Sequence, residues 1–336
     1  MCMKYHIIGY VRNDSLAGMT REDALRLTHV NLAFGLIRDG VLDLSQLSFL
    51  HLLPKLRLWN PSLKIVLSVG GWGAGGFSQM AMTDDGRYRF ARSCLDAVEA
   101  HGLDGIDIDW EYPCSDAAGI DADPRDRENF TALLRTLRAV LGNRRILSVA
   151  VGADASCLAG IEMGKVARIV DYVQLMTYDM LQGTRAGHHA ALGAAKGDTS
   201  GLNTRDTVER CHAAGVPYGK IIIGAALYGR HFAVTSGKNH GLLQSSGGGL
   251  PGPVYGEITE GYLRENGFSV YWDADAEANY LWNGKTLVSY ESPEAIRRKC
   301  EYVKKQRLLG IMYWEHGNDP SRQLLGVMAR TLAEAE

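Results

Sequence analysis

Three carboxylates recur at every second residue within one short, otherwise apolar segment. Residues 104–113 read DGIDIDWEYP, in which Asp107, Asp109 and Glu111 alternate with apolar side chains. Side chains alternate between the two faces of a β-strand, so the three acids share one face, roughly 7 Å apart along it. Repulsion and burial disfavour their ionised forms, so at least one should keep its proton near neutral pH. A carboxylic acid in that state can act as a general acid.

The position of this segment in a fold decides whether the acids do chemistry. Pro113 marks the end of the strand-like run. In a barrel enzyme, the carboxyl ends of the strands form the face that carries the active site. Two other interpretations fit the spacing alone, an amphipathic strand with solvated acids and a divalent-cation site.

A repeated unit along the chain predicts the scaffold. Each unit is a short apolar, β-branched run followed by a segment with helical spacing of apolar residues. The strand-like runs lie at 6–11, 29–34, 64–69, 105–110, 146–151, 172–177, 221–225 and 309–314, and helical segments include 20–27, 86–100, 124–141 and 204–214. Eight alternating β and α units indicate an α/β fold, a (β/α)₈ TIM barrel.

The rhythm is interrupted once, after the seventh strand. Residues 231–290 contain a Gly/Ser/Pro-rich stretch at 245–253, which predicts a turn-rich surface loop, and strand-like pieces at 269–272 and 286–290. The helical pattern resumes at 292–306. We therefore expect a barrel formed by 1–230 and 291–336, with a small α+β insertion at 231–290.

Composition excludes several classes of partner. Apolar residues make up 46% and charged residues 22%, with a net charge of −2. This is ordinary for a soluble globular enzyme and offers no basic footprint for nucleic acid or anionic membranes. The sequence predicts a monomer that binds neither nucleic acid nor membrane.

The chain start and the cysteines suggest where the protein works. No secretory signal is visible at the N-terminus, so the sequence as it stands predicts a cytoplasmic protein; a secreted one whose signal has been removed is the alternative. The six cysteines are scattered without CxxC pairs, which favours free thiols. No metal site and no cofactor are expected.

The acidic segment resembles the DGxDxDxE signature of glycoside hydrolase family 18, the chitinases and related enzymes. Four other segments resemble motifs of the same family: SVGGW at 68–72, QLMTYD at 174–179, LYGR at 227–230 and GIMYWE at 310–315. The resemblance spans essentially the whole chain and includes the insertion, which resembles the chitinase insertion domain. It implies a chitinase that acts on chitin or N-acetylglucosamine oligosaccharides.

The resemblance also implies which residues contact the sugar. The tryptophan of the last motif would form the floor under the sugar at the cleavage site, and the arginine of LYGR would reach towards bound sugar. The substrate-binding positions implied in this way are Tyr10, Phe34, Gly71, Trp72, Met176, Asp179, Tyr228, Arg230 and Trp314.

The family mechanism implies roles for four catalytic residues. Glu111 would protonate the glycosidic oxygen while the substrate's own 2-acetamido group attacks the anomeric carbon, with retention of configuration. Asp109 would orient the acetamide and stabilise an oxazolinium intermediate, and Asp107 would share a proton with Asp109. Tyr178 would hold the acetamide carbonyl.

One departure from the family pattern and three alternatives remain. Residues 180–183 lack the tryptophan often found there, which puts in doubt the aromatic platform on the leaving-group side. An endo-β-N-acetylglucosaminidase acting on N-glycans shares the acidic motif. An inactive chitin-binding lectin shares the barrel, but such proteins typically lose the acid that Glu111 supplies here. A barrel enzyme with a metal on the acidic strand is the third alternative.

Overall fold

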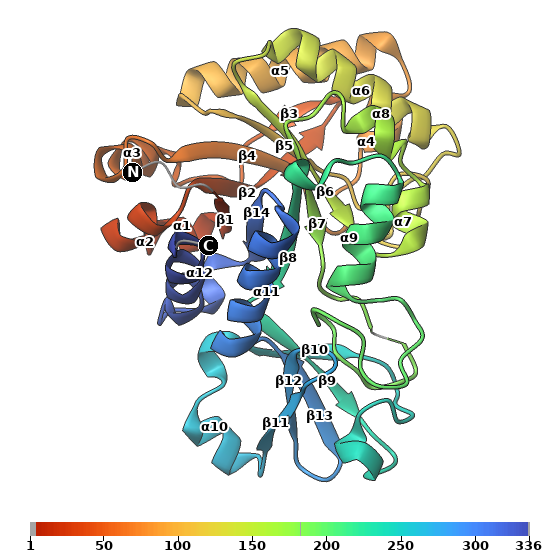
Figure 1. The fold of residues 1–336 in the computed structure, drawn as a ribbon. Helices are drawn as coiled ribbons and strands as arrows, with labels where there is room; N and C mark the ends of the chain where they lie inside the picture. Colours follow the sequence, from red (N-terminus) through yellow and green to blue (C-terminus); the bar gives the residue numbers. More distant parts are fainter. Residues whose placement is uncertain (1–4, 182, 335–336) are drawn as a thin grey trace.

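Eight parallel strands close into a barrel, as the sequence predicts (Figure 1). The computed structural model describes residues 5–181 and 183–334. The strand order is β1-β14-β8-β7-β6-β5-β4-β2, and β1 pairs with β2 to close the ring. The strands are β1 (His6–Arg12), β2 (His29–Arg38), β4 (Lys64–Gly70), β5 (Gly105–Asp109), β6 (Ile146–Gly152), β7 (Tyr172–Met176), β8 (Ile221–Ala226) and β14 (Gly310–Trp314). A short antiparallel strand, β3 (Val41–Asp43), extends β2.

Helices surround the barrel, and several begin at the caps that their sequences supply. Thr20, Thr83, Asn203 and Ser292 each accept a hydrogen bond from a backbone N–H in the first turn of α2, α5, α9 and α11, respectively. The longer helices are α2 (Arg21–Arg26), α3 (Leu53–Trp59), α5 (Asp84–His101), α6 (Asp126–Leu141), α9 (Thr204–Ala213), α11 (Pro293–Gln306) and α12 (Gln323–Ala333). Shorter ones are α1 (Asn13–Ala17), α4 (Phe77–Ala81), α7 (Ala155–Ala159) and α8 (Met163–Val166).

The packing of Trp110 sets which face of the acidic strand looks inward. Its indole is buried outside the barrel, stacked on Phe77 at 5.1 Å and edge-on to Phe130 at 5.7 Å between ring centroids. Such aromatic contacts stabilise beyond the area they bury. A shift of one residue would turn every side chain to the other face, so this packing holds the acids on the inner face.

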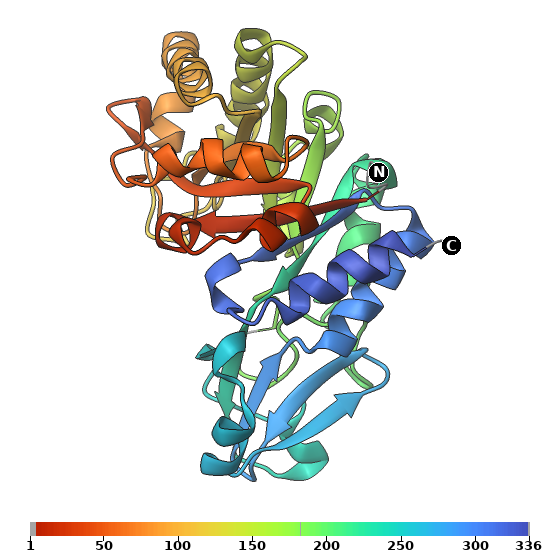
Figure 2. The same ribbon diagram turned by 90° about the vertical axis from the view of Figure 1, so that its left-hand side faces the viewer.

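A second, antiparallel sheet forms a separate lobe beside the barrel (Figures 1 and 2). Its order is β10-β9-β13-β12-β11. The strands are β9 (Tyr228–Ala233), β10 (Leu250–Val254), β11 (Ser269–Asp273), β12 (Ala278–Trp282) and β13 (Thr286–Tyr290), and α10 (Glu260–Glu265) lies among them. The sheet begins at Tyr228, before the expected start of the insertion, and the division at 231 and 290 stays a prediction.

The expectation of a surface loop at 245–253 is wrong for its second half. Residues from Leu250 onwards form β10, which pairs with β9 and has an irregular register between Pro251 and Val254. Proline lacks a backbone donor and is tolerated mainly at sheet edges. Since β10 lies at the edge of the sheet, its two prolines destabilise the strand little. The same prolines made the segment resemble a loop in the sequence.

A buried ion pair fastens the end of the second lobe to the barrel. Lys299 Nζ lies 2.8 Å from Glu291 Oε1 and donates to the Gly224 carbonyl at 2.9 Å. Glu291 Oε2 also accepts from the Ala226 backbone N–H at 2.5 Å. Removing one member of such a pair would leave an uncompensated buried charge. The segment after β13 is therefore held against β8.

The described cysteines are free thiols, and the described helices are too short or too polar to cross a membrane. Cys94, Cys114, Cys157, Cys211 and Cys300 form no disulfide, while Cys2 lies outside the described residues. Gln182, in the segment where the family tryptophan is missing, also lies outside them. Among residues 5–181 and 183–334, no helix has the length and apolar character to cross a membrane.

Three rings meet inside the barrel at the beginning of its strands. His6 and His29 lie 4.4 Å apart between centroids, and both pack edge-on to Tyr172. Burial, together with the charges of His6 and Lys64, lowers the pKa of His29 to about 3. His29 is therefore neutral in the folded state at pH values where the unfolded chain protonates it.

We expect His29 to make the fold sensitive to acid. The unfolded state binds an extra proton below about pH 6.5, so the free energy of unfolding should fall by up to about 1.4 kcal/mol per pH unit towards the folded pKa. Urea unfolding of the wild type and of His29→Phe, measured between about pH 7 and 4, should show a shallower acid slope in the variant. The exposed His51→Phe serves as control, and equal slopes for wild type and His29→Phe would contradict this expectation.

Candidate active site

The three acids lie together, rising from the barrel interior to its mouth. Asp107 and Asp109 are buried on β5, and Glu111 follows in the turn just beyond the strand, partly exposed. The sequence placed all three on one face, and the inward packing of Asp107 and Asp109 agrees with that parity. The row therefore ends at the carboxyl edge of the barrel, where this fold carries chemistry.

Asp107 is held from four sides at the centre of the barrel. Its Oδ2 accepts from the Tyr10 hydroxyl at 2.9 Å and from Ser68 Oγ at 2.7 Å. Its Oδ1 accepts from Ser148 Oγ at 2.7 Å and from Gln174 Nε2 at 2.8 Å. Burial raises the pKa of Asp107, and these hydrogen bonds oppose the rise. The residue is thus fixed by β1, β4, β6 and β7 together.

Asp109 has a different environment one step above. Burial raises its pKa well above the ordinary value, and the charges of Glu111 and Asp107 raise it further. Its Oδ1 is buried and has no hydrogen-bond partner among the described residues. A buried carboxyl oxygen without a partner is costly. This oxygen is also an acceptor that a bound ligand can satisfy.

Glu111 has the properties of a general acid near neutral pH. Its pKa is raised to about 7: burial raises it most, a hydrogen bond with Tyr112 opposes the rise, and the charge of Asp179 adds to it. General acids work best when their pKa lies near the working pH. Glu111 therefore stays partly protonated at neutral pH.

Tyr178 lies within range of the charges of the acids, just after β7. Its hydroxyl is 3.9 Å from Met312 Sδ, and its ring packs edge-on to Tyr228 at 6.1 Å. Burial, followed by the charges of Asp109 and Glu111, raises the pKa of Tyr178 well above its ordinary value. Its hydroxyl therefore remains a donor, and Met176, two residues earlier, shares its inward direction at the end of β7.

Asp179 accepts hydrogen bonds from two residues of the second lobe. Its carboxylate accepts from the Tyr228 hydroxyl and from Arg230 Nε, each at 2.6 Å. Although burial raises the pKa of Asp179, hydrogen bonds from His189 and Arg230 hold it well below the ordinary value. Arg230 and Tyr228 are thus committed to Asp179 in this structure, and their contacts with sugar remain a prediction.

Aromatic rings form a floor beside the acids. Phe34 stacks on Trp314 with centroids 5.4 Å apart, and Tyr10 lies tilted against Trp314 at 5.9 Å. The peptide bonds Ala33–Phe34, Glu111–Tyr112 and Trp314–Glu315 are cis. Gly71 has a φ of 91°, and a Cβ there would lie 2.7 Å from Phe34 Cε2. Glycine is needed at 71 because no side chain fits against the floor.

A cavity of about 670 Å³ lies over this floor. Its lining includes Phe34, Gly71, Trp72 and Trp314, together with the polar residues Arg12, Asn13, Asp14 and Gln46. Trp72 is 65% exposed, unusual for so large an apolar side chain, and its ring edge faces Tyr112. Tyr10 is buried below and donates to Asp107 instead of lining the cavity. Exposed rings beside polar groups suit a neutral, amphipathic ligand such as a sugar.

Comparison with known proteins identifies the family. The sequence model described as "Glycosyl hydrolases family 18" matches residues 6–319. The chain belongs to glycosyl hydrolase family 18. It is 33% identical over 301 residues to Chitinase A1 of Niallia circulans, covering 81% of this chain and 43% of that protein. It is 31% identical over 290 residues to Chitotriosidase-1 of Mus musculus, covering 78% of this chain and 60% of that protein. The chain thus spans about half the length of these curated relatives.

A solved structure of family 18 matches over nearly its full length. The N-acetylglucosaminidase of Paenibacillus barengoltzii superposes with a TM-score of 0.95 at 45% identity, covering 97% of this chain and 99% of that chain. The predictions of a family 18 chitinase-type domain and of the glycoside hydrolase class are confirmed.

Sequence reasoning missed several residues of this family 18 site. Ser68, Ser148 and Gln174, which hold Asp107, received no role of their own. All three are buried polar residues in the middle of apolar strands. Buried polar groups need partners, so that position was the available signal. His189 was also missed, because it follows β7 in an irregular loop.

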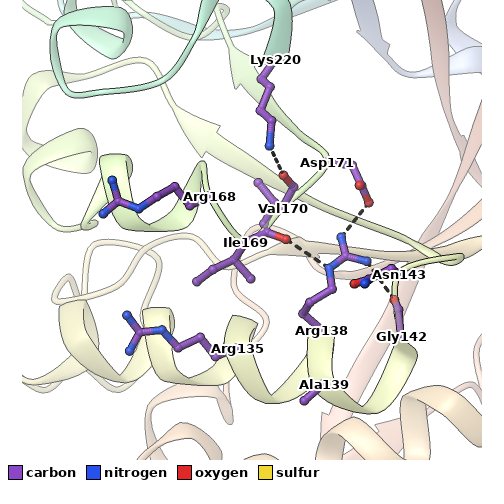
Figure 3. Close-up of a pocket in the computed structure, with 10 residues that line it drawn as sticks. All are labelled: Arg135, Arg138, Ala139, Gly142, Asn143, Arg168, Ile169, Val170, Asp171 and Lys220. Atoms are coloured by element: carbon purple, nitrogen blue, oxygen red, sulfur yellow. Dashed lines mark hydrogen bonds and ion pairs between the residues drawn. The ribbon is translucent and has the colours of Figure 1, made fainter.

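A second cavity, of about 700 Å³, lies away from the family 18 site (Figure 3). Arg138 donates to the carbonyls of Ile169 and Gly142 and to Asp171, and Lys220 donates to the Val170 carbonyl. These residues precede β6, β7 and β8, at the amino ends of the strands, where barrels place stabilising contacts.

Among the described residues, no group of three or more His, Cys, Asp or Glu side chains could hold a metal ion.

Proposed function

We propose that this chain is a retaining hydrolase of β-1,4-linked N-acetylglucosamine polymers, chitin and chito-oligosaccharides, and that it uses substrate-assisted catalysis. The observation that carries the proposal is the pairing of Glu111 with Asp109 at the barrel mouth. Glu111 has a pKa raised to about 7, and buried Asp109 offers an unpartnered oxygen beside an aromatic floor.

The first step is proton transfer to the leaving group. A sugar rests on Trp314, and Glu111 gives its proton to the glycosidic oxygen as the bond from that oxygen to the anomeric carbon breaks. The acetamide oxygen of the same sugar forms a new bond to the anomeric carbon from the opposite side. The product is a cyclic oxazolinium ion, and Glu111 is left as a carboxylate.

The buried acids and Tyr178 orient and stabilise this intermediate. Asp109 accepts the acetamide N–H through its unpartnered oxygen and offsets the positive charge that develops. Asp107 shares a proton with Asp109 and adjusts its charge. Tyr178, kept protonated by its raised pKa, donates to the acetamide oxygen.

The second step restores the enzyme. Glu111 takes a proton from water, whose oxygen attacks the anomeric carbon and opens the oxazolinium ring. Two successive inversions leave the product with the configuration of the substrate. Glu111 is again protonated for the next cycle.

The comparisons support the substrate class and favour one variant of it. Two curated relatives are named as a chitinase and a chitotriosidase, while the structural neighbour at 45% identity is named as an N-acetylglucosaminidase. That second name favours release of single N-acetylglucosamine units as the variant activity.

Fluorogenic N-acetylglucosamine oligosides of one, two and three sugars test the proposal. Cleavage of the two- or three-sugar substrate supports chitinase-type action, and preference for the one-sugar substrate supports the N-acetylglucosaminidase variant. If the wild type binds all of these sugars and cuts none, the proposal fails. N-glycoproteins then distinguish the glycan-trimming enzyme from the inactive lectin.

The pH dependence of kcat should follow the titration of Glu111. The protonated form is the donor, and the pKa is raised to about 7, so kcat should fall about tenfold per pH unit on the alkaline side. Rates at saturating substrate between about pH 5 and 10 measure this limb. A decline in kcat that begins at about pH 5, close to the pKa of an ordinary glutamate, would contradict the assignment.

A further inference from the structure

His189 joins the loop after β7 to both lobes of the molecule. It is 0% exposed in its side chain and lies ten residues after Asp179. It contacts Asp179, just after β7, on one side and the second sheet on the other. A buried histidine with contacts of this kind is expected to fix the relative position of its partners.

On the barrel side, His189 holds Asp179. Its Nδ1 lies 3.3 Å from the Asp179 backbone N and 3.5 Å from Asp179 Oδ1, so it contacts both the main chain and the carboxylate. Its carbonyl accepts from the Met180 backbone N–H at 3.0 Å. Asp179 has a φ of 55°, a conformation that non-glycine residues adopt only with support from their surroundings. His189 supplies that support.

On the side of the second sheet, His189 meets the strands that carry the other site residues. Its backbone N–H donates to Ser289 Oγ on β13 at 2.9 Å. Ser289 lies opposite Arg230 in the register between β13 and β9. The His189 ring also packs against the ring of Tyr228, with centroids 5.2 Å apart. His189 thus contacts Asp179 and also the second sheet. Tyr228 and Arg230, which donate hydrogen bonds to Asp179, lie on β9 of that sheet.

The neighbouring His188 has a different set of contacts. Its Nε2 lies 3.1 Å from Asp273 Oδ2, and its ring packs edge-on to Tyr280 at 5.6 Å. It is buried like His189. These side-chain partners belong to the second sheet, away from the acids. The two adjacent histidines therefore separate two roles, support of the second lobe and support of the site.

We propose that His189 is a positioning residue for the active site: it sets the conformation of Asp179 and thereby the placement of Tyr178, Tyr228 and Arg230 around the sugar. This assignment rests on the proposed function, because those residues are expected to contact substrate. Without the imidazole, Asp179 loses support for its left-handed backbone and one partner of its carboxylate. The position of Tyr178, which precedes Asp179 in the chain, then changes together with that of Asp179.

Three variants test this role. His189→Ala removes the contacts, His189→Asn restores a polar group near the position of Nδ1, and His188→Ala is the matched control from the same buried dipeptide. kcat and KM are measured on the two-sugar fluorogenic substrate. Affinity for tri-N-acetylchitotriose is measured by calorimetry in the Glu111→Gln background, which does not depend on turnover. Melting temperature and circular dichroism report the fold of each variant.

We expect His189→Ala to raise KM and weaken affinity about tenfold or more, since the partly buried Asp179 backbone N–H loses its acceptor and the Asp179 carboxylate loses the neighbouring imidazole. His189→Asn should recover most of that loss. His188→Ala should lower the melting temperature while KM and affinity stay within about twofold of the wild type.

Two results from the variants would overturn the assignment. Equal losses of affinity in His189→Ala and His188→Ala would show that both act only through general packing, and no recovery in His189→Asn would show that the polar group is irrelevant. A wild type that binds the trisaccharide without cleaving the substrates contradicts the proposed function, while the affinities still decide the role of His189. A wild type that neither binds nor cleaves overturns both.

Discussion

Glu111→Gln should lose nearly all hydrolysis of N-acetylglucosamine oligosaccharides and still bind them. The amide cannot supply the proton that the leaving oxygen needs, while its shape and most of its contacts match those of the acid. General acid catalysis contributes roughly 10²–10⁴-fold to rate, so kcat should fall by that order. Steady-state rates with the two-sugar substrate and calorimetry with the trisaccharide measure the two effects separately.

The matched control for this variant is Glu265→Gln, an exposed acid at the end of α10 in the second lobe. It makes the same chemical change far from the barrel mouth and should leave kcat unaltered. If Glu111→Gln keeps more than about a tenth of the wild-type kcat, the proton comes from another group. If it loses sugar binding as well, the role of Glu111 is structural.

The second large effect concerns the substrate itself. A cello-oligosaccharide has the same β-1,4 linkage but a hydroxyl in place of the 2-acetamido group, so it lacks the internal nucleophile. Asp109, whose unpartnered oxygen would accept the acetamide N–H, has no group to orient in that sugar. We expect no measurable cleavage of a cello-oligosaccharide under conditions in which the chito-oligosaccharide of equal length is consumed.

Binding measurements make that comparison decisive. The two sugars present similar apolar faces to Phe34 and Trp314, so weak binding of the cello-oligosaccharide is expected even without cleavage. Cleavage at a rate comparable with that of the chito-oligosaccharide would mean that the nucleophile is an enzyme carboxylate or water, and not the acetamide group. Asp109 would then be the first residue to test, since it is the acid nearest in sequence on the same face.

The central part of the site was predictable because strand parity is a local property. The alternation of acids and apolar residues at 104–113 fixes which side chains can face inward, and Trp110 packs outside as that alternation requires. Eight strands separated by helical segments likewise predicted the barrel. In these places, local pattern and global packing demand the same arrangement.

Other features depend on contacts that no local pattern encodes. The prolines in 250–254 predict a loop, but the segment forms a strand. An edge strand tolerates proline because one side of it needs no backbone donors. The Tyr10 hydroxyl donates to Asp107, 97 residues away in the chain, and strand spacing alone does not predict that contact. His189 acquires Tyr228 and Ser289 as partners only when the loop after β7 meets β9 and β13, which come later in the chain. Such tertiary placements cannot be derived from periodicity.

The most direct test of the mechanism is the configuration of the product at the moment of release. Proton NMR during hydrolysis of a chito-oligosaccharide distinguishes the two anomers before they equilibrate in solution. The proposed sequence, with internal attack and then attack by water, predicts that the β-anomer appears first. Early appearance of the α-anomer would show single displacement by water and would contradict the roles assigned to Asp109 and to the acetamide group.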